Sequence, residues 1–199
     1  MRISIMDYGV GNLFSISKGF ERAGAKVDVI SDPAELVDSE CIVFPGVGAF
    51  GAAMGALQPV LPELRRKIER GTPTLGICLG MQILFERSEE SPGNGLSVIK
   101  GAVKRLTSGR IPHMGWNDVV AGPDPLFKDV PKTAQYYFAN SYVCHPSENV
   151  GIAHTDYGER FFSVVRKGSI YGSQFHPEKS GRVGLALLKN FVDFAEGSR

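Results

Sequence analysis

The sequence has little of what would direct a protein to a membrane, to nucleic acid or into a secretory route. Lys and Arg total 22 and Asp and Glu total 21, a formal net charge of +1, so bulk charge attracts it neither to nucleic acid nor to an anionic membrane. No apolar stretch is long enough to span a bilayer, and residues 1–7 alternate like a strand instead of forming a signal peptide. We therefore expect a cytoplasmic protein that binds no nucleic acid and no membrane.

Cysteine is also scarce, which excludes a disulfide framework and a cysteine-based zinc site. The three cysteines, at positions 41, 78 and 144, cannot all pair, and their spacings suit no zinc site. We expect free thiols in a reducing compartment, with no metal and no cofactor. The useful question is which of the three thiols reacts.

The first half of the sequence alternates strand and helix patterns. Apolar or alternating runs predict strands at 2–6, 26–30, 41–44 and 74–77. Helical patterns follow them at 13–23, from Pro33, at 62–70 and directly after Cys78. This alternation predicts a three-layer, flavodoxin-like α/β fold, in which a mostly parallel sheet has helices on both faces. The length of 199 residues, without a linker or repeat, favours one domain over residues 1–199.

The second half changes character, because short strand patterns separated by Gly, Pro, Asn and Asp replace the alternation. Strands are predicted at 96–106, 116–120, 135–143, 150–155, 161–166 and 169–174. A hairpin turn falls at 166–169, and a final helix covers 182–195. These patterns predict an antiparallel extension of the same sheet in the C-terminal half.

Cys78 lies where a reactive thiol could be exposed. The run Gly76-Ile77-Cys78-Leu79-Gly80 joins a buried strand to a helix through a sharp turn, the form of a nucleophile elbow. The start of a helix supplies unpaired N–H groups and partial positive charge, which favour a thiolate and a developing oxyanion. A buried core cysteine is the alternative reading of this pattern alone. Cys41 and Cys144 have no such turn, and we assign both to the core.

His176-Pro177-Glu178 could supply a base and the group that orients it. In an extended segment residues i and i+2 project from the same face, and proline biases the residue before it towards extended geometry. The imidazole and the carboxylate would then stand side by side, as in a nucleophilic triad. The alternative is a strand-end histidine beside a surface glutamate. That ordinary reading is kept for the histidines without such a neighbour: His113, His145 and His154.

Residues 45–50, Pro-Gly-Val-Gly-Ala-Phe, directly follow the third predicted strand. Glycines there let backbone N–H groups approach a ligand closely. The string from Gly46 to Gly51 also fits the Gly-x-Gly-x-x-Gly pattern of dinucleotide sites, but it follows the third strand and no ribose-binding charge lies at the right distance. An oxyanion or carboxylate cradle suits it better. Gln82, one helical turn after Cys78, is well placed to touch whatever Cys78 attacks.

Together, a Gly-x-Cys-x-Gly elbow, an earlier Pro-Gly loop and a late His-x-Glu resemble the class I, triad-type glutamine amidotransferases across nearly the whole chain. Four longer motifs look like those of the glutaminase subunits of imidazole glycerol phosphate synthases. They are Asp7-Tyr8-Gly9-Val10-Gly11-Asn12-Leu13, Pro45-Gly46-Val47-Gly48-Ala49-Phe50, Pro112-His113-Met114-Gly115-Trp116-Asn117 and Phe175-His176-Pro177-Glu178-Lys179-Ser180. No triad position departs from the family pattern.

The resemblance implies a glutaminase that releases ammonia through a thioester on Cys78 and supplies it to a separate (β/α)8-barrel synthase subunit in a heterodimer. That subunit would make imidazole glycerol phosphate and an aminoimidazole carboxamide ribotide in histidine biosynthesis. Carried over by position, the catalytic residues are Cys78, His176 and Glu178, and the oxyanion donors lie at Val47, Gly48 and Leu79. L-Glutamine would contact Gly46, Gln82 and Glu90. It would also contact Ser141 and Tyr142, which belong to the segment Asn140-Ser141-Tyr142. The synthase would contact Met114, Trp116, Asn117, Tyr137 and Lys179, although Trp116 could be a hairpin core residue and Lys179 a solvated charge.

Two other readings remain open at this point. Another amidotransferase glutaminase, serving pyridoxal phosphate or anthranilate synthesis, would share the triad, but the motif at 112–117 argues against it. A flavodoxin-like binding or signalling module would leave Cys78 inert. The two glycines around Val47 also motivate a hypothesis of control, in which a Val47 peptide flip completes the oxyanion site only when the partner binds.

Overall fold

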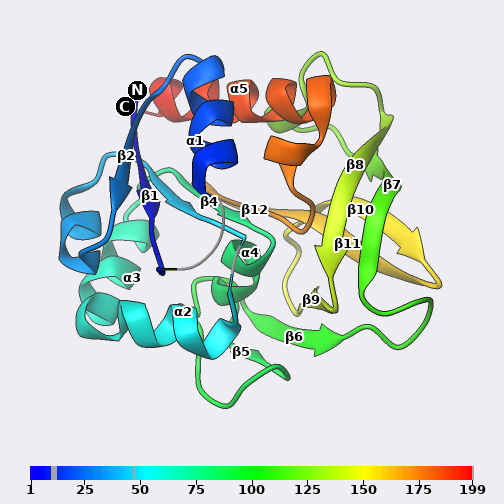
Figure 1. Ribbon diagram of the computed structural model, residues 1–199, viewed down its shortest axis with the longest axis horizontal. Helices are drawn as coiled ribbons and strands as arrows, with labels where there is room; N and C mark the ends of the chain where they lie inside the picture. Colours follow the sequence, from blue (N-terminus) through cyan, green and yellow to red (C-terminus); the bar gives the residue numbers. More distant parts are fainter. Residues whose placement is uncertain (10–12, 47, 199) are drawn as a thin grey trace.

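The computed structural model describes residues 1–9, 13–46 and 48–198, and its described strands form two sheets. The main sheet has the order β2-β1-β3-β4-β12-β11-β10-β7-β8, and a second sheet has the order β5-β6-β9. Figure 1 shows the main sheet at the centre of the molecule, with helices on either side of its first half. The expected α/β class is confirmed.

The first half of the main sheet is parallel, as the alternation of strands and helices predicts. Each of these strands is short, and all but the edge strand β2 are almost wholly buried, which suits apolar runs covered on both faces. They are β1 (Arg2–Met6), β2 (Lys26–Ile30), β3 (Ile42–Phe44) and β4 (Thr74–Ile77), joined by β12 (Ile170–Ser173). β12 pairs in parallel with β4, with Gly172 opposite Gly76. The chain therefore returns to the centre of the sheet after an excursion of more than ninety residues.

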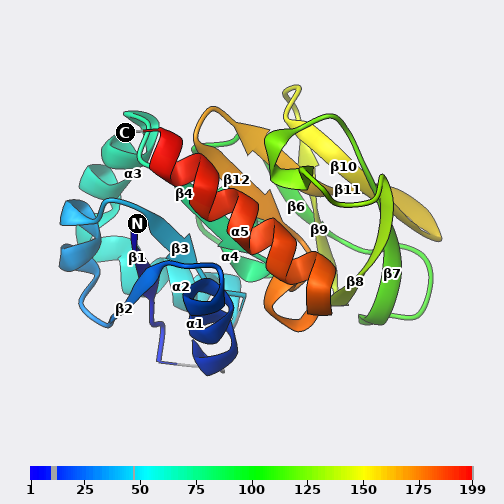
Figure 2. The same cartoon turned by 90° about the horizontal axis from the view of Figure 1, so that it is seen from above.

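Helices cover the two faces of this parallel half and divide the core in two. One face carries α1 (Leu13–Arg22) and α5 (Gly181–Gly197), and α5 lies over the middle of the sheet in Figure 2. Side chains such as Ile5 and Phe191 form the core there. The other face carries α2 (Phe50–Leu57), α3 (Leu61–Glu69) and α4 (Leu79–Ile83), over a core that includes Phe44 and Leu64. Alternate residues of each strand enter opposite cores, as the pleat requires.

Four antiparallel strands extend the main sheet beyond β12. They are β11 (Glu159–Lys167), β10 (Gly151–Tyr157), β7 (His113–Ala121) and β8 (Thr133–Asn140). The hairpin predicted at 166–169 is confirmed, because Lys167 pairs with Ile170 across its turn. The antiparallel extension is therefore present, with longer strands at 113–121 and 159–167 than the sequence indicates.

The second sheet is a correction to the predicted strands. It contains β5 (Arg87–Ser88), β6 (Gly101–Arg105) and β9 (Tyr142–Pro146). The strand predicted at 96–106 begins only at Gly101, and the strand predicted at 135–143 is two strands that break at Ser141. The break arises because the backbone changes partners there: the Ser141 carbonyl accepts the Leu106 N–H at 2.9 Å, so the chain leaves β7 and joins β6.

Short helices complete the chain. They are η1 (Pro33–Asp38), η2 (Gln58–Val60), η3 (Pro125–Phe127) and η4 (Pro177–Lys179), all one or two 3₁₀ turns. The Asp124 carboxylate, only 5% exposed, anchors η3 by accepting from Arg166 at 2.8 Å and from the Tyr171 hydroxyl at 3.1 Å. Within the described residues, no helix combines the length and apolar character needed to cross a membrane.

Candidate active site

Cys78 lies at the turn between β4 and α4, in a backbone conformation that few non-glycine residues adopt. Its φ of 50° and ψ of −104° cost about 1–3 kcal/mol in typical proteins, and such strain concentrates at functional sites. The flanking glycines permit the turn, because a Cβ at Gly76 would collide with the Gly80 carbonyl and one at Gly80 with the Phe44 carbonyl. This is the strand-to-helix elbow that the sequence indicates.

His176 and Glu178 follow β12, the strand beside β4, so they arrive at the same sheet edge as Cys78. His176 Nδ1 lies 2.8 Å from Glu178 Oε1, and both side chains are buried. The expected extended geometry is wrong after His176: residues 177–179 form η4, because proline is favourable in the first turn of a helix. The turn still brings the carboxylate back to the imidazole.

The loop after β3 touches both halves of the site at Gly46. A Cβ added to Gly46 would lie 2.7 Å from Cys78 Cβ, 2.8 Å from His176 Cε1 and 2.8 Å from the Ile77 carbonyl oxygen. Distances this short are not tolerated by real Cβ atoms, so only glycine fits. The thiol-bearing and imidazole-bearing side chains therefore meet beneath this loop.

The electrostatics of this group favour a charged imidazole. Burial alone lowers the pKa of His176, but hydrogen bonds to Cys78 and Glu178, together with their negative charges, raise it to about 10. The ring is thus protonated at neutral pH. Its backbone is fixed as well: the His176 N–H donates to the Tyr137 carbonyl at 2.8 Å, and Ser180 Oγ donates to the His176 carbonyl at 2.6 Å.

The residues expected to hold glutamine fall into two groups, one near Tyr142 and one at the start of α2. Gln82 is buried, and its Nε2 donates to the Tyr142 carbonyl at 3.2 Å, as does Asn140 Nδ2 at 3.1 Å. The buried Asn140 Oδ1 has no hydrogen-bond partner among the described residues. Glu90 instead lies at the start of α2, where its Oε2 accepts the Phe50 N–H at 2.7 Å. It thereby anchors the end of the loop that begins at Pro45.

The residues expected to form the oxyanion site are only partly described. Val47 lies outside the described residues. Gly48 is exposed, with a φ of 91° that favours glycine, and Leu79 is the buried first residue of α4. The part of the chain that the structure describes thus contributes one helix-start residue and one loop glycine.

Gln174 is a residue of this site that the sequence patterns do not reveal. It is fully buried, and its Nε2 donates to Cys78 Sγ at 3.6 Å. The one available signal is a polar amide within the buried segment 170–175. That signal is weak, because such an amide usually satisfies backbone groups.

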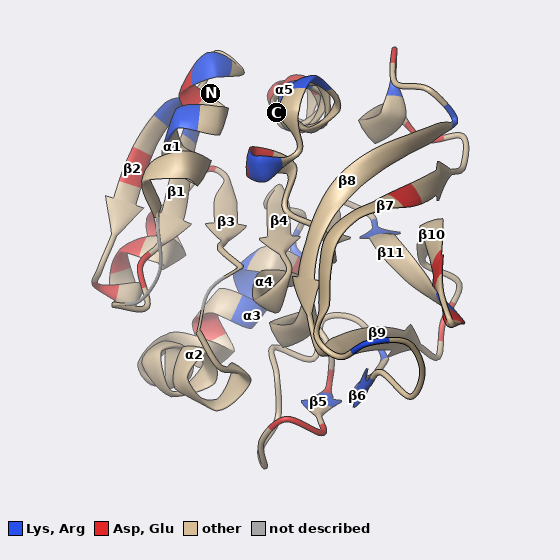
Figure 3. Cartoon of the chain, turned by 45° about the vertical axis from the view of Figure 1, so that its right-hand side comes forward, with Lys and Arg blue, Asp and Glu red and all other residues tan. Residues whose placement is uncertain are grey.

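Most of the residues expected at a partner interface share one exposed face. Met114 and Trp116 are 65% and 55% exposed on β7, and Trp116 pairs across the strands with Tyr137, ring centroids 6.2 Å apart. Lys179 Nζ lies 5.9 Å from the Tyr137 ring centroid. Figure 3 shows β8 without a charged residue along its length. Asn117 differs, because its side chain donates inward to the Asp156 carbonyl at 3.2 Å.

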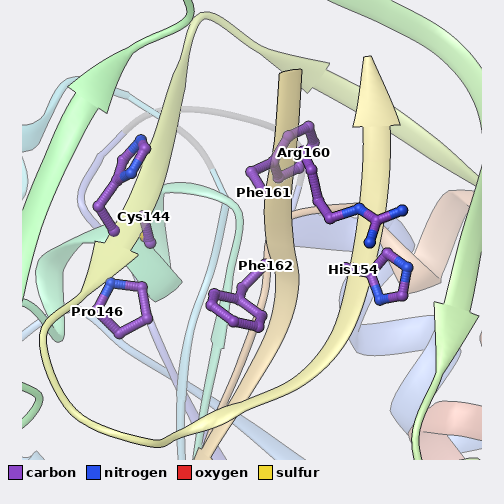
Figure 4. A pocket seen from close by; sticks show the side chains of 7 residues that line it. Cys144, Pro146, His154, Arg160, Phe161 and Phe162 are labelled. Carbon is purple, nitrogen blue, oxygen red and sulfur yellow. The ribbon is translucent and has the colours of Figure 1, made fainter. Parts of the chain in front are cut away.

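Other candidate centres lack this combination of groups. Burial raises the pKa of the Cys144 thiol well above its usual value, which disfavours a thiolate. A separate pocket of about 450 Å³ between β9, β10 and β11 is lined by residues that include His145, His154 and Phe162. Figure 4 shows the side chains of His154 and Phe162 among those around it. None of the three expected triad residues lines it. Among the described residues, no cluster of His, Cys, Asp and Glu could hold a metal ion.

Comparison with known proteins defines the class. A sequence profile described as "Glutamine amidotransferase class-I" matches residues 4–194. A crystal structure described as that of a glutamine amidotransferase has a TM-score of 0.77 at 20% identity, covering 98% of each chain. PurLQS from Thermotoga maritima also has a TM-score of 0.77, at 22% identity, covering 97% of this chain and 98% of that one. The chain belongs to the class I glutamine amidotransferase family and is an enzyme of that class.

Curated relatives identify the branch of the family. Imidazole glycerol phosphate synthase subunit HisH of Methanothermobacter thermautotrophicus is 45% identical, over 96% of this chain and 98% of its own. The subunit of the same name from Moorella thermoacetica is 46% identical, over 95% of this chain and 93% of its own. Within the amidotransferases, the chain belongs with these HisH subunits, which favours this branch over the other glutaminases considered above.

Proposed function

We propose that the chain hydrolyses L-glutamine to glutamate and ammonia with Cys78, His176 and Glu178, and delivers the ammonia to a synthase subunit in histidine biosynthesis. The observation that carries the proposal is the buried 2.8 Å contact between His176 and Glu178 at the sheet edge where Cys78 turns into α4. A nucleophile, a base and an orienting carboxylate are the groups that acyl transfer requires. Membership of the HisH branch supports the choice of glutamine.

The reaction starts from a thiolate and a charged imidazole. The pKa of His176 is raised to about 10, so the ring holds a proton at neutral pH and, in the proposed reaction, pairs with the thiolate of Cys78. The thiolate attacks the side-chain amide carbon of glutamine, and backbone N–H groups of Leu79 and the Val47–Gly48 region stabilise the oxyanion, each donor worth about 3–4 kcal/mol in comparable sites. His176 then gives its proton to the leaving ammonia.

The second half of the cycle regenerates the enzyme. His176, now neutral, accepts a proton from water, which attacks the Cys78 thioester and releases glutamate. Glu178 keeps the ring in place throughout and stabilises its charged form. Gly46, Gln82, Glu90, Ser141 and Tyr142 hold the substrate. Glu90 would then serve both glutamine and the start of α2, since its Oε2 accepts from Phe50.

The partner would bind the exposed face formed by Met114, Trp116, Tyr137 and Lys179. Exposed aromatic and methionine side chains are typical of interface centres, and the lysine would lie at their polar rim. The partner is a (β/α)8-barrel subunit, which uses the ammonia to convert a phosphoribulosyl-formimino carboxamide nucleotide into imidazole glycerol phosphate and an aminoimidazole carboxamide ribotide. Asn117 bonds within the chain and would support this face from behind.

The position of the loop at 45–50 supports control by the partner. One end of the loop lies against Cys78 and His176 at Gly46, and the other is held by Glu90 at Phe50. A change in this loop on partner binding would alter the oxyanion site directly. Full glutaminase turnover by the isolated chain, unchanged on adding the synthase subunit, would contradict this control.

A glutamine-analogue electrophile tests the nucleophile. It should label Cys78 with one equivalent, and Cys78→Ala should abolish both labelling and glutamate release. Cys144→Ala is the matched control, because that thiol is buried in β9 and should leave labelling at Cys78 intact. Glutamate release by the Cys78→Ala variant would overturn the triad. Ammonia transfer assayed with different synthase partners identifies the acceptor.

A further inference from the structure

A buried chain of polar contacts leads from the sulfur of Cys78 to the corner between β8 and β9. Gln174 Nε2 donates to Cys78 Sγ at 3.6 Å, and Gln174 Oε1 accepts from Gln82 Nε2 at 3.5 Å. Gln82 Nε2 also donates to the Tyr142 carbonyl at 3.2 Å. One fully buried side chain, that of Gln174, therefore touches both the expected nucleophile and a residue expected to hold the substrate.

The orientation of the Gln174 amide follows from its neighbours. The Tyr142 carbonyl can only accept, so the Gln82 group facing it must be the NH2. That NH2 in turn needs an acceptor from Gln174, which must present its oxygen there and its own NH2 to the sulfur. The reverse orientation would oppose two NH2 groups inside the protein. The donor to Cys78 is thus fixed by the network.

The backbone around Gln174 holds the amide in place. The Gln174 N–H donates to the Ser163 carbonyl of β11 at 2.8 Å, and the Cys78 N–H donates to the Ser173 carbonyl at 2.7 Å. Gln174 therefore links strand β11 to the elbow, and its side chain has no exposed surface. An amide so constrained can act on the sulfur without a cost of ordering.

We infer that Gln174 is a positioning residue that favours and aims the Cys78 thiolate, an inference that rests on the proposed role of Cys78 as nucleophile. Besides His176, the sulfur has two polar neighbours of opposite preference: the Ala139 carbonyl at 3.9 Å accepts only, and the Gln174 amide donates. A neutral thiol can donate to Ala139. A thiolate can only accept, so proton transfer to His176 turns the sulfur towards Gln174, because hydrogen bonds to ionised acceptors are the stronger ones.

The same side chain links the nucleophile to the substrate. When Gln82 binds the substrate, Gln174 restrains the side-chain amide of Gln82. Gln174 is itself held against the sulfur of Cys78. Gln174 therefore fixes the distance between a substrate-binding amide and the attacking atom. Removing Gln174 should lower kcat through the thiolate and raise KM through Gln82, whereas removing Gln82 should act mainly on KM.

Two variants separate these effects. Gln174→Met keeps the side-chain length but removes the donor, and Gln82→Met removes the substrate amide while leaving Gln174 beside the sulfur. The measurements are the pH midpoint of Cys78 alkylation by iodoacetamide, followed by peptide mass spectrometry, and kcat and KM for glutamine in the complex with the synthase subunit. Gln174→Met should raise the midpoint by about one pH unit and lower kcat roughly tenfold or more. Gln82→Met should raise KM and shift the midpoint by less than Gln174→Met does, because the donor beside the sulfur is retained.

Controls keep the result interpretable. Gln58→Met makes the same chemical change at an exposed residue of η2 and should alter neither quantity. If Gln174→Met does not fold, Gln174→Glu keeps the shape, and its carboxylate should raise the midpoint by repelling the thiolate. An unchanged midpoint in a folded Gln174 variant would overturn the inference. Failure of the wild-type chain to be alkylated at Cys78 would instead overturn the proposed nucleophile.

Discussion

Replacing Gly46 by alanine is the most direct perturbation of the site, because it adds one methyl group between nucleophile and base. The new Cβ would lie 2.7 Å from Cys78 Cβ and 2.8 Å from both His176 Cε1 and the Ile77 carbonyl oxygen. Non-bonded carbon atoms prefer separations of about 3.5 Å or more, so the two carbon neighbours must retreat by roughly 0.7–0.8 Å. One of the three neighbours is backbone, and the other two carry the proposed chemistry.

The expected cost divides between activity and stability. A displacement of about 1 Å at reacting groups can lower a rate roughly a hundredfold, so we expect kcat for glutamine hydrolysis to fall by about that factor. Overpacking of a dense interior costs about 1–3 kcal/mol, so the free energy of unfolding should fall by a similar amount. The activity loss should exceed what partial unfolding explains, because most of the chain would remain folded.

Glutamate release in the presence of the synthase subunit, together with urea denaturation, measures both effects. Gly55→Ala is the matched control, since a Cβ at this exposed residue of α2 meets no atom within 4 Å. It should keep full activity and, as a helix-interior change, gain up to about 1 kcal/mol. If Gly46→Ala kept kcat within about twofold of the wild type, the described approach of loop, thiol and imidazole would be refuted.

Three further changes test separate parts of the molecule. Glu178→Gln removes one of the groups that raise the pKa of His176 to about 10. Because this folded-state pKa lies above the unfolded value of 6.5, the contribution to stability is complete below about pH 6 and is lost as pH rises through about 10. The decrease in Tm caused by the substitution should therefore become smaller over that range, and a decrease that does not depend on pH would contradict this reasoning. Trp116→Ala should weaken binding of the synthase subunit, measured by calorimetry, by about 2 kcal/mol, which is roughly thirtyfold in Kd. Phe162→Ala, which changes the separate pocket, should leave this Kd unchanged, and equal effects of the two substitutions would argue against this interface. Asp124→Ala should lower the free energy of unfolding, measured by urea denaturation, by about 1.5–3 kcal/mol, because Arg166 and Tyr171 lose their acceptor. The kcat of the folded chain should not change. An unchanged free energy of unfolding would contradict the anchoring of η3.

The fold was predictable where local patterns decide it. Buried apolar runs such as Thr74–Ile77 and the alternation with helices lead to the parallel half of the sheet. α2 was not predicted, because Phe50–Leu57 contains two glycines and no charged residue, so its sequence has no polar face to reveal a helical period. The second sheet was also missed, since a strand pattern does not say which neighbour a strand pairs with. Ser141 changes partners through one long-range hydrogen bond.

The candidate site shows the same division between local and non-local information. The Gly76–Gly80 turn could be predicted, because its glycines and its neighbouring strand are adjacent in sequence. The sequence led us to expect His176 and Glu178 side by side in an extended segment. Residues 177–179 instead form η4, so the local geometry behind this expectation was wrong. Gln174 could not be found, because its importance lies in a contact with Cys78, 96 residues away. Only the register of β12 against β4 brings the two together.

That register also has a consequence for how the enzyme becomes active. β12 pairs with both β4 and β11, so Cys78 and His176 meet only when two strands more than ninety residues apart in sequence have paired. Contacts of such large sequence separation slow folding, because the long connection between the two strands must be closed first. We therefore expect a nascent or partly folded chain to carry a thiol without its base. Glutamine would be hydrolysed only by chains whose folding is complete, which makes the order of assembly itself a safeguard against wasted ammonia.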